Sequence, residues 1–231
     1  MDRSYSKKWR DYLENILVAI FLALFVRTFI LTGYKVPTSS MAPTLKPGDF
    51  IFAYRLPYGV KIPLSAQKLS IKVPERGDVV VFTYPDQPRV SYVKRVVGLP
   101  GDRIEIINGE LFINEQKSQY AEKLTDEILD LPGYDQFRVM TETFSQKSHE
   151  IILNKSTSPK SFGPFIVPQK QIFLLGDNRD ASDDSRYWGG VPIDRVEGKV
   201  IMIWLSLDSQ KKWGDNRFPS IRTDRLFHKV E

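Results

Sequence analysis

The sequence of 231 residues contains no cysteine and only two histidines. The absence of cysteine excludes disulfides, cysteine-ligated metal sites and a cysteine nucleophile. Neither His149 nor His228 lies beside a Gly-x-Ser-x-Gly turn or at metal-ligand spacing, which argues against a Ser–His–Asp triad and a zinc site. We therefore expect no bound metal, and we expect both histidines to be structural or on the surface.

Long runs of one charge, internal repeats and low-complexity tracts are also absent. The formal net charge is +5, but acidic residues are interspersed among the basic ones, so the sequence predicts no nucleic-acid partner. Its length and its hydrophobic content of 42% suit one globular domain, or one domain with an anchor.

One apolar run is long, the segment NILVAIFLALFV at 15–26. Counted from Tyr12 to Tyr34, the segment reaches the roughly 20 residues that a membrane-spanning helix needs. A cleavable signal peptide is the weaker alternative, because TGYKVPTSS follows and offers no small-x-small site. A buried helix of a soluble protein would need neighbours that a chain end seldom has. We predict a tail at 1–11, a transmembrane anchor at 12–34 and a folded domain at 35–231.

Basic residues flank this run unevenly. Lys35 is the only basic residue close behind it, whereas the preceding tail holds four: Arg3, Lys7, Lys8 and Arg10. The positive-inside rule therefore predicts a cytoplasmic N-terminus and a domain on the far side of the membrane. We expect the cytoplasmic membrane, or a thylakoid membrane if the source is photosynthetic.

After the anchor the sequence is typical of a mostly β domain. Turns at 47–49 (PGD) and 75–78 (ERGD) precede the predicted strands at 50–54 and 79–82, and VIMIWLSL at 200–207 is a further strand. Two alternating runs within 103–115 flank Asn108–Gly109, a strong hairpin signal. Residues 116–170 are more polar and irregular, and we expect them to form an inserted cap.

Without a suitable histidine, a serine nucleophile would need another base, and lysine can serve if its pKa falls from about 10.4 to about 7. Burial among apolar groups lowers the pKa in this way. Strand alternation in RVSYVKRVVGL places Lys94 on one face with Val90, Tyr92 and Val96. An edge-strand lysine that prevents aggregation is the structural alternative. The pattern alone leaves both interpretations open.

Candidate serines lie in PTSSMAPTLKPGD at 37–49, where three prolines exclude a helix. Such a stiff loop can hold a hydroxyl in fixed geometry, although a juxtamembrane linker has a similar composition. A rival pattern, Ser65-x-x-Lys68, matches the S-x-x-K motif of penicillin-binding proteins. That motif needs a K-T-G element, which the sequence lacks.

Three segments resemble, in order and in position behind an anchor, the boxes of the type I signal peptidases of bacteria and photosynthetic organelles. They are PTSSMAPTL (37–45), YVKRVVGLPGD (92–102) and GDNRDASDDSRYWGGVP (176–192). The resemblance implies an antiparallel, barrel-like catalytic β-sheet domain with a variable cap inserted at 116–170 and one N-terminal transmembrane helix. It also implies an endopeptidase that removes signal peptides from exported preproteins by cutting after a small-x-small motif.

By the same resemblance, Ser40 is the nucleophile and Lys94 the general base. The backbone N–H of Ser40 and the hydroxyl of Thr38 would hold the oxyanion. Ser182 matches the serine that forms a hydrogen bond to the catalytic lysine and orients it. The remaining matched positions are Asp184 and Arg186, an ion pair; Val36, Tyr92 and Val93, walls of the substrate pockets; and Asp177, Asn178 and Arg179, which match without a derived role.

The implied partners are preprotein signal peptides and the lipid bilayer, and the implied chemistry needs no metal or organic cofactor. Two alternatives stay open. The chain could be an inactive paralogue, or an anchored β-domain that binds partners. A soluble, self-cleaving Ser–Lys repressor fits less well, because it would carry a DNA-binding helix pair where this chain has an apolar run.

Overall fold

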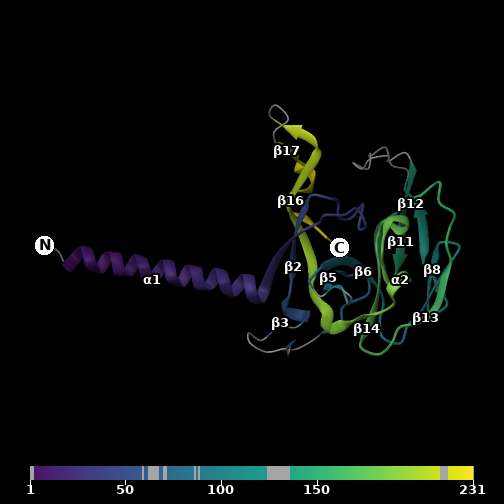
Figure 1. The fold of residues 1–231 in the computed structure, drawn as a ribbon, viewed down its shortest axis with the longest axis horizontal. Coiled ribbons are helices and arrows are strands. Elements are labelled where there is room, and N and C mark those ends of the chain that lie inside the picture. The colour runs from purple at the N-terminus through teal and green to yellow at the C-terminus, as the bar shows by residue number, and fades with distance from the viewer. Residues whose placement is uncertain are drawn as a thin grey trace.

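The computed structural model describes residues 3–58, 60–61, 68–69, 72–85, 87, 89–123, 136–213 and 218–230. A long helix projects from one end of a β-rich body, and Figure 1 shows the longest strand, β16, at the base of that helix. Within the described residues every pair of strands is antiparallel apart from one isolated bridge between residues 152 and 178. The mostly β fold predicted from the sequence is therefore confirmed.

The projecting helix consists of α1 (Arg3–Phe25) and a short π-helical turn, η1 (Val26–Ile30). The part from Trp9 to Ile30 is long and apolar enough to cross a membrane, and none of it is buried against the protein. The helix ends earlier than the predicted anchor, because residues 31–34 belong to strand β1 (Leu31–Lys35). Their backbone groups pair with β2 (Asp49–Tyr54) and not within a helix.

Nine strands form the main sheet, in the order β1-β2-β16-β5-β6-β14-β15, with β17 and β18 also paired to β16. The further bounds are β5 (Val79–Thr83), β6 (Ser91–Gly98), β14 (Gln171–Leu175), β15 (Val191–Pro192), β16 (Val196–Trp213), β17 (Phe218–Ile221) and β18 (His228–Lys229). The predicted strands at 50–54, 79–82 and 200–207 all lie in this sheet.

Alternate residues of β5 face two different apolar clusters. Val79 and Val81 pack with Ile51 and Ile203, whereas Val80 and Phe82 pack in a second cluster on the other side of the strand. A strand that is buried on both faces reads as a continuous apolar run, which is the pattern of VVVF. The main sheet therefore has a core on each side, and β6 runs beside β5 between them.

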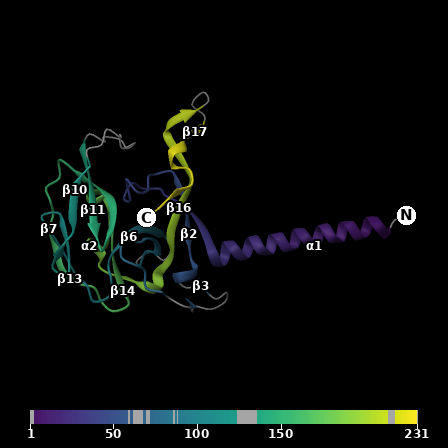
Figure 2. The same ribbon diagram turned by 180° about the vertical axis from the view of Figure 1, so that it is seen from behind.

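Two smaller sheets lie at the far side of the body from α1, as Figures 1 and 2 show from opposite directions. One has the order β13-β7-β8-β9 and the other β10-β11-β12. The bounds are β7 (Arg103–Ile107), β8 (Glu110–Ile113), β9 (Gln116–Lys117), β10 (Gln119–Glu122), β11 (Phe137–Phe144), β12 (Lys147–Asn154) and β13 (Phe162–Ile166).

The predicted hairpin is confirmed, because β7 and β8 pair around Asn108 (φ 50°) and Gly109 (φ 82°). Positive φ at both turn residues is what a two-residue hairpin turn requires. The predicted insertion at 116–170 contains strands β9 to β13, and β13 pairs with β7, a strand that precedes the insertion. We call the two smaller sheets together the cap. Residues 124–135 of the predicted insertion lie outside the described residues.

Short elements complete the chain. The strands β3 (Val60–Lys61) and β4 (Lys68–Leu69) pair with each other, and the short helices are η2 (Leu56–Tyr58), η4 (Arg179–Ala181), α2 (Ser185–Trp188), η5 (Ile193–Arg195) and η6 (Thr223–Arg225). Of these, η4 and α2 follow β14 directly and bring the third matched box next to β6.

Candidate active site

Ser40 lies in the turn-rich loop between β1 and β2. The apolar side chains that follow it are buried: Met41 and Leu45 pack on the main sheet, and Ala42 packs against β11 and β12 of the cap. At the end of the loop, Gly48 adopts φ +92°, and a Cβ atom there would lie 2.0 Å from the carbonyl oxygen of Leu207. The PGD turn therefore requires glycine, and the loop is held at both ends.

Lys94 reaches this loop from β6. Its amine nitrogen Nζ lies 2.5 Å from Ser40 Oγ, and only 1% of the residue is exposed. Burial lowers the pKa of Lys94 from 10.5 to about 8, even though Asp184, Asp177 and Asp183 act in the opposite direction. Because a neutral amine can accept a proton and an ammonium cannot, this arrangement can generate a serine nucleophile near neutral pH.

Thr38 lies two residues before the serine, and its hydroxyl oxygen is 3.4 Å from Ser40 Oγ. A hydroxyl beside the attacking oxygen can donate to a carbonyl oxygen that gains negative charge. The structure therefore brings together Thr38, Ser40 and Lys94, three of the residues predicted from the sequence.

Ser182 is also next to the nucleophile loop. A Cβ atom at Gly176 would lie 2.2 Å from Ser182 Oγ and 2.5 Å from the carbonyl oxygen of Ser40, so these three backbone segments are packed closely. The hydrogen bond expected between Ser182 and Lys94 is not formed: Ser182 Oγ is buried and finds no partner among the described residues.

Asp184 and Arg186 form a two-pronged ion pair, with Nε–Oδ1 at 2.7 Å and Nη2–Oδ2 at 2.8 Å. Asp184 is fully buried and is the N-cap residue of α2, and it also accepts a hydrogen bond from the backbone N–H of Gly176. The pair thus connects the two ends of the segment that carries Ser182.

The three residues expected to line substrate pockets are divided between the two cores. Val36 is buried in the cluster that contains Met41, and Val93 packs against that cluster. Tyr92 packs in the second cluster, where its ring centroid is 6.2 Å from that of Phe82 and 6.0 Å from Lys94 Nζ. Apolar groups therefore border the Ser40–Lys94 contact.

The sequence matches, over residues 9–205, the profile of a family described as "Signal peptidase, peptidase S26". The chain belongs to this family. A signal peptidase I of Pseudomonas fluorescens is 36% identical over 214 residues, which cover 87% of this chain and 74% of that protein. A signal peptidase I of Rickettsia typhi is 37% identical over 226 residues, which cover 91% of this chain and 85% of that protein.

Among solved structures, a signal peptidase I from Enterococcus faecalis V583 has 30% sequence identity to this chain. The superposition covers 56% of this chain and 98% of that one, with a TM-score of 0.34. The family assignment rests on the sequence matches.

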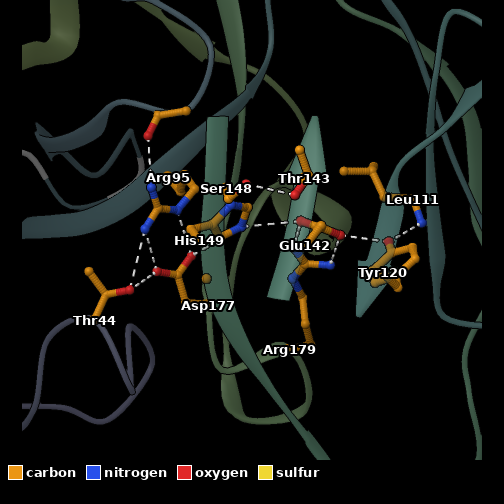
Figure 3. A network of polar contacts seen from close by, with 12 residues as sticks. Thr44, Arg95, Leu111, Tyr120, Glu142, Thr143, Ser148, His149, Asp177 and Arg179 are labelled. Atoms are coloured by element: carbon orange, nitrogen blue, oxygen red, sulfur yellow. Dashed lines mark hydrogen bonds and ion pairs between the residues drawn. The ribbon is translucent and has the colours of Figure 1, made fainter. Parts of the chain in front are cut away.

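In this member of the family, sequence reasoning missed a buried polar network. Figure 3 shows it extending from Thr44 and Arg95 to Tyr120. Its members are Thr44, Arg95, Tyr120, Glu142, His149, Asp177 and Arg179. Asp177 and Arg179 matched the third box without a role, and Arg95 lies in the second box but was not singled out. Glu142 carried no local signal.

The two histidines have different environments. His149 is buried in this network, so it is structural, whereas His228 is exposed. The rival serine of the S-x-x-K pattern, Ser65, lies outside the described residues.

Proposed function

We propose that this chain is a membrane-anchored serine endopeptidase that removes signal peptides from exported preproteins, with Ser40 as nucleophile and Lys94 as general base. The observation that carries the proposal is the 2.5 Å contact between Lys94 Nζ and Ser40 Oγ, made by a lysine that is almost fully buried. Membership of the signal peptidase family supports the substrate class.

In the proposed reaction, the neutral amine of Lys94 takes the proton of Ser40 while Ser40 Oγ forms a bond to the scissile carbonyl carbon. The backbone N–H of Ser40 and the hydroxyl of Thr38 hold the resulting oxyanion. Lys94 then gives its proton to the leaving amine, which produces an acyl-enzyme. Lys94 next takes a proton from water, and the resulting hydroxide forms a bond to the acyl carbon. The bond from that carbon to Ser40 Oγ then breaks, Lys94 returns the proton to Oγ, and the peptide leaves with a new carboxyl group.

Substrate selection would come from the apolar surroundings of the dyad. Val36 and Val93, which belong to the cluster that contains Met41, and Tyr92, which packs in the second cluster, would form the walls of the pockets, and large side chains at the cut site would clash with them. We therefore propose small residues at the first and third positions before the cut. The Asp184–Arg186 pair would hold the segment that carries Ser182 against the loop of Ser40.

The helical segment up to Ile30 would anchor the enzyme in the bilayer. Basic residues concentrate before the helix, so we place the N-terminus in the cytoplasm and the folded domain, from residue 35 onward, on the other side. The cytoplasmic membrane is the proposed location, with a thylakoid membrane as the counterpart in a photosynthetic source.

Cleavage of a preprotein with an Ala-x-Ala site, in detergent or liposomes, tests the proposal. Ser40→Ala and Lys94→Ala should abolish cleavage, whereas Ser39→Ala, a matched control at the adjacent serine, should retain it. Circular dichroism verifies that each variant is folded. Cleavage by a folded Ser40→Ala variant would refute the dyad. A folded wild type that cuts nothing would favour the inactive paralogue or the binding module.

A further inference from the structure

A row of buried charges connects the cap to the main sheet (Figure 3). Five ionisable side chains follow one another across it, with exposed fractions between 0% and 8%: Arg95, Asp177, His149, Glu142 and Arg179. Burying charges costs free energy unless each is paired, so such a row persists only where its geometry is well satisfied.

Each carboxylate in the row is held by a guanidinium group. Arg95 Nε and Nη2 donate to Asp177 at 2.9 and 2.8 Å. Arg179 Nη1 donates to Glu142 Oε1 at 3.0 Å, and Nη2 donates to Oε2. Tyr120 adds a 2.6 Å hydrogen bond from its hydroxyl to Glu142 Oε1.

His149 separates the two ion pairs. Its Nε2 lies 3.2 Å from Glu142 Oε2 and 3.9 Å from Asp177 Oδ1, and neither contact is a hydrogen bond in the described part of the chain. With His149 neutral, two cations balance two anions. Removal of one carboxylate would leave two buried guanidinium groups with a single anion, which is a costly imbalance.

The cap also holds the third box through its backbone. Ile152 of β12 donates its N–H to the carbonyl oxygen of Asp177 at 3.0 Å, and the N–H of Asn154 donates to Asp180 Oδ2 at 2.7 Å. Ile152 and Asn178 form an isolated parallel bridge. The segment from Gly176 to Asp184, which we call the support loop, is thus attached to the cap along its first half.

The support loop in turn holds the nucleophile. The N–H of Asn178 donates to the carbonyl oxygen of Ser40 at 3.1 Å, and Asn178 Nδ2 donates to the carbonyl oxygen of Ser39 at 3.2 Å. Thr44, farther along the nucleophile loop, donates to Asp177. A displacement of the support loop would therefore move Ser40 relative to Lys94.

We propose that Glu142 of the cap is a positioning residue for catalysis, acting through Arg179 and the support loop on Ser40. The inference rests on the proposed function, in which Ser40 is the nucleophile. It assigns to the inserted cap a role in the chemical step and not only in covering the sheet.

The test compares Glu142→Gln with Glu150→Gln in the full-length enzyme, using a preprotein with an Ala-x-Ala site. Glu150 is a matched control, because it pairs with Lys123 outside the buried row. Displacement of a reacting group by about 1 Å can cost about 100-fold in rate, so we expect kcat of Glu142→Gln to fall between 10- and 100-fold. We expect KM to change less than about threefold, and Glu150→Gln to match wild type.

Rates are normalised to the folded fraction, measured by circular dichroism well below the midpoint of unfolding. An unchanged kcat per folded molecule would overturn the proposal even if Glu142→Gln unfolds at lower temperature. So would a raised KM with unchanged kcat, since that pattern belongs to substrate binding. If Glu142→Gln does not fold, Tyr120→Phe decides, because it removes the hydroxyl that donates to Glu142 and accepts the backbone N–H of Leu111, and leaves both charges of the Glu142–Arg179 pair in place. A kcat equal to wild type in Tyr120→Phe would then overturn the proposal.

A double variant adds a second criterion. The double variant Glu142→Gln/Arg179→Gln lacks both charges. Its fold-decrease in kcat should be smaller than the product of the fold-decreases in the two single variants. Independent, multiplicative losses would contradict action through Arg179. Ser40→Ala in the same series separates the two hypotheses. Residual cleavage there refutes the proposed function and with it the role of Glu142, whereas loss of cleavage in Ser40→Ala together with a normal kcat in Glu142→Gln refutes only the role of Glu142.

Discussion

Lys94 Nζ lies 2.5 Å from Ser40 Oγ, although 54 residues separate the two in the chain. Only the neutral amine can act as base, so activity should depend on its deprotonation.

The pH dependence of kcat/KM follows from this contact. Below a pH of about 8 Lys94 is mostly protonated, so kcat/KM should rise with pH and level off above that value. The profile is measured on a preprotein substrate between roughly pH 5 and 10, with enzyme stability checked at each pH. A plateau already reached in the acidic range would be incompatible with lysine as the base.

Thr38 allows a test of the oxyanion hole. Thr38→Val removes the hydroxyl and preserves the shape of the side chain, so we expect kcat to fall by about 100-fold, as for loss of one oxyanion donor. Thr38→Ser keeps the hydroxyl and should retain most activity. Single-turnover kinetics separate this effect from product release. Equal rates for the two variants would exclude the hydroxyl from the hole.

Gly176→Ala tests the close packing of the support loop. The new methyl group would meet Ser182 Oγ at 2.2 Å and the backbone oxygen of Ser40 at 2.5 Å, so the two loops must separate. We expect activity to fall by at least about 100-fold and the melting temperature to decrease. Gly33→Ala is the control, because its methyl group would meet Phe52 only at 3.8 Å. Near-normal activity in Gly176→Ala would show that the loops tolerate separation.

His149 predicts a dependence of stability on pH. Burial lowers its pKa below 6.5, aided by Arg95 and opposed by Glu142 and Asp177, while the ring of Phe144 packs edge-on against it. Below pH 6.5 the unfolded chain therefore binds a proton at His149 that the folded chain does not, so stability falls as the pH decreases.

Glu142 and Asp177, whose pKa values are held low by Arg179, Arg95 and His149, add to the loss at still lower pH, where only the unfolded carboxylates protonate. Thermal unfolding between about pH 7 and pH 5 should show the melting temperature of wild type decreasing, with a shallower decrease in His149→Gln. An equal slope in both proteins would mean that His149 titrates alike in the folded and unfolded states.

Much of the fold could be predicted because its signals are local. The turn at Asn108–Gly109 needs two residues with positive φ, and β5 needs a run of branched apolar residues, and both patterns are legible in the sequence. The full length of β16 could not be predicted. Its eighteen residues pair with four different strands, and only distant partners decide where such a strand begins and ends.

The candidate site, too, could be predicted from the sequence only in part. Lys94 was identifiable as a charge on an apolar strand face, and the family resemblance named Ser40. The link from Glu142 to Arg179 joins strand β11 to a short helix after β14, and no spacing in the sequence reports that contact. Ser182 is the converse case, because the resemblance implied a bond to Lys94 and the structure has none among the described residues.

No loop separates the apolar helix from the catalytic sheet. The turn η1 ends at Ile30, strand β1 begins at Leu31, and β1 pairs with β2 over its whole length. With α1 in a bilayer, the direct connection restricts rotation of the sheet and its movement away from the membrane. The distance of Ser40 from the lipid surface is therefore fixed. Which bond is within reach then depends on how far a substrate emerges from the membrane, in addition to the side chains that flank it.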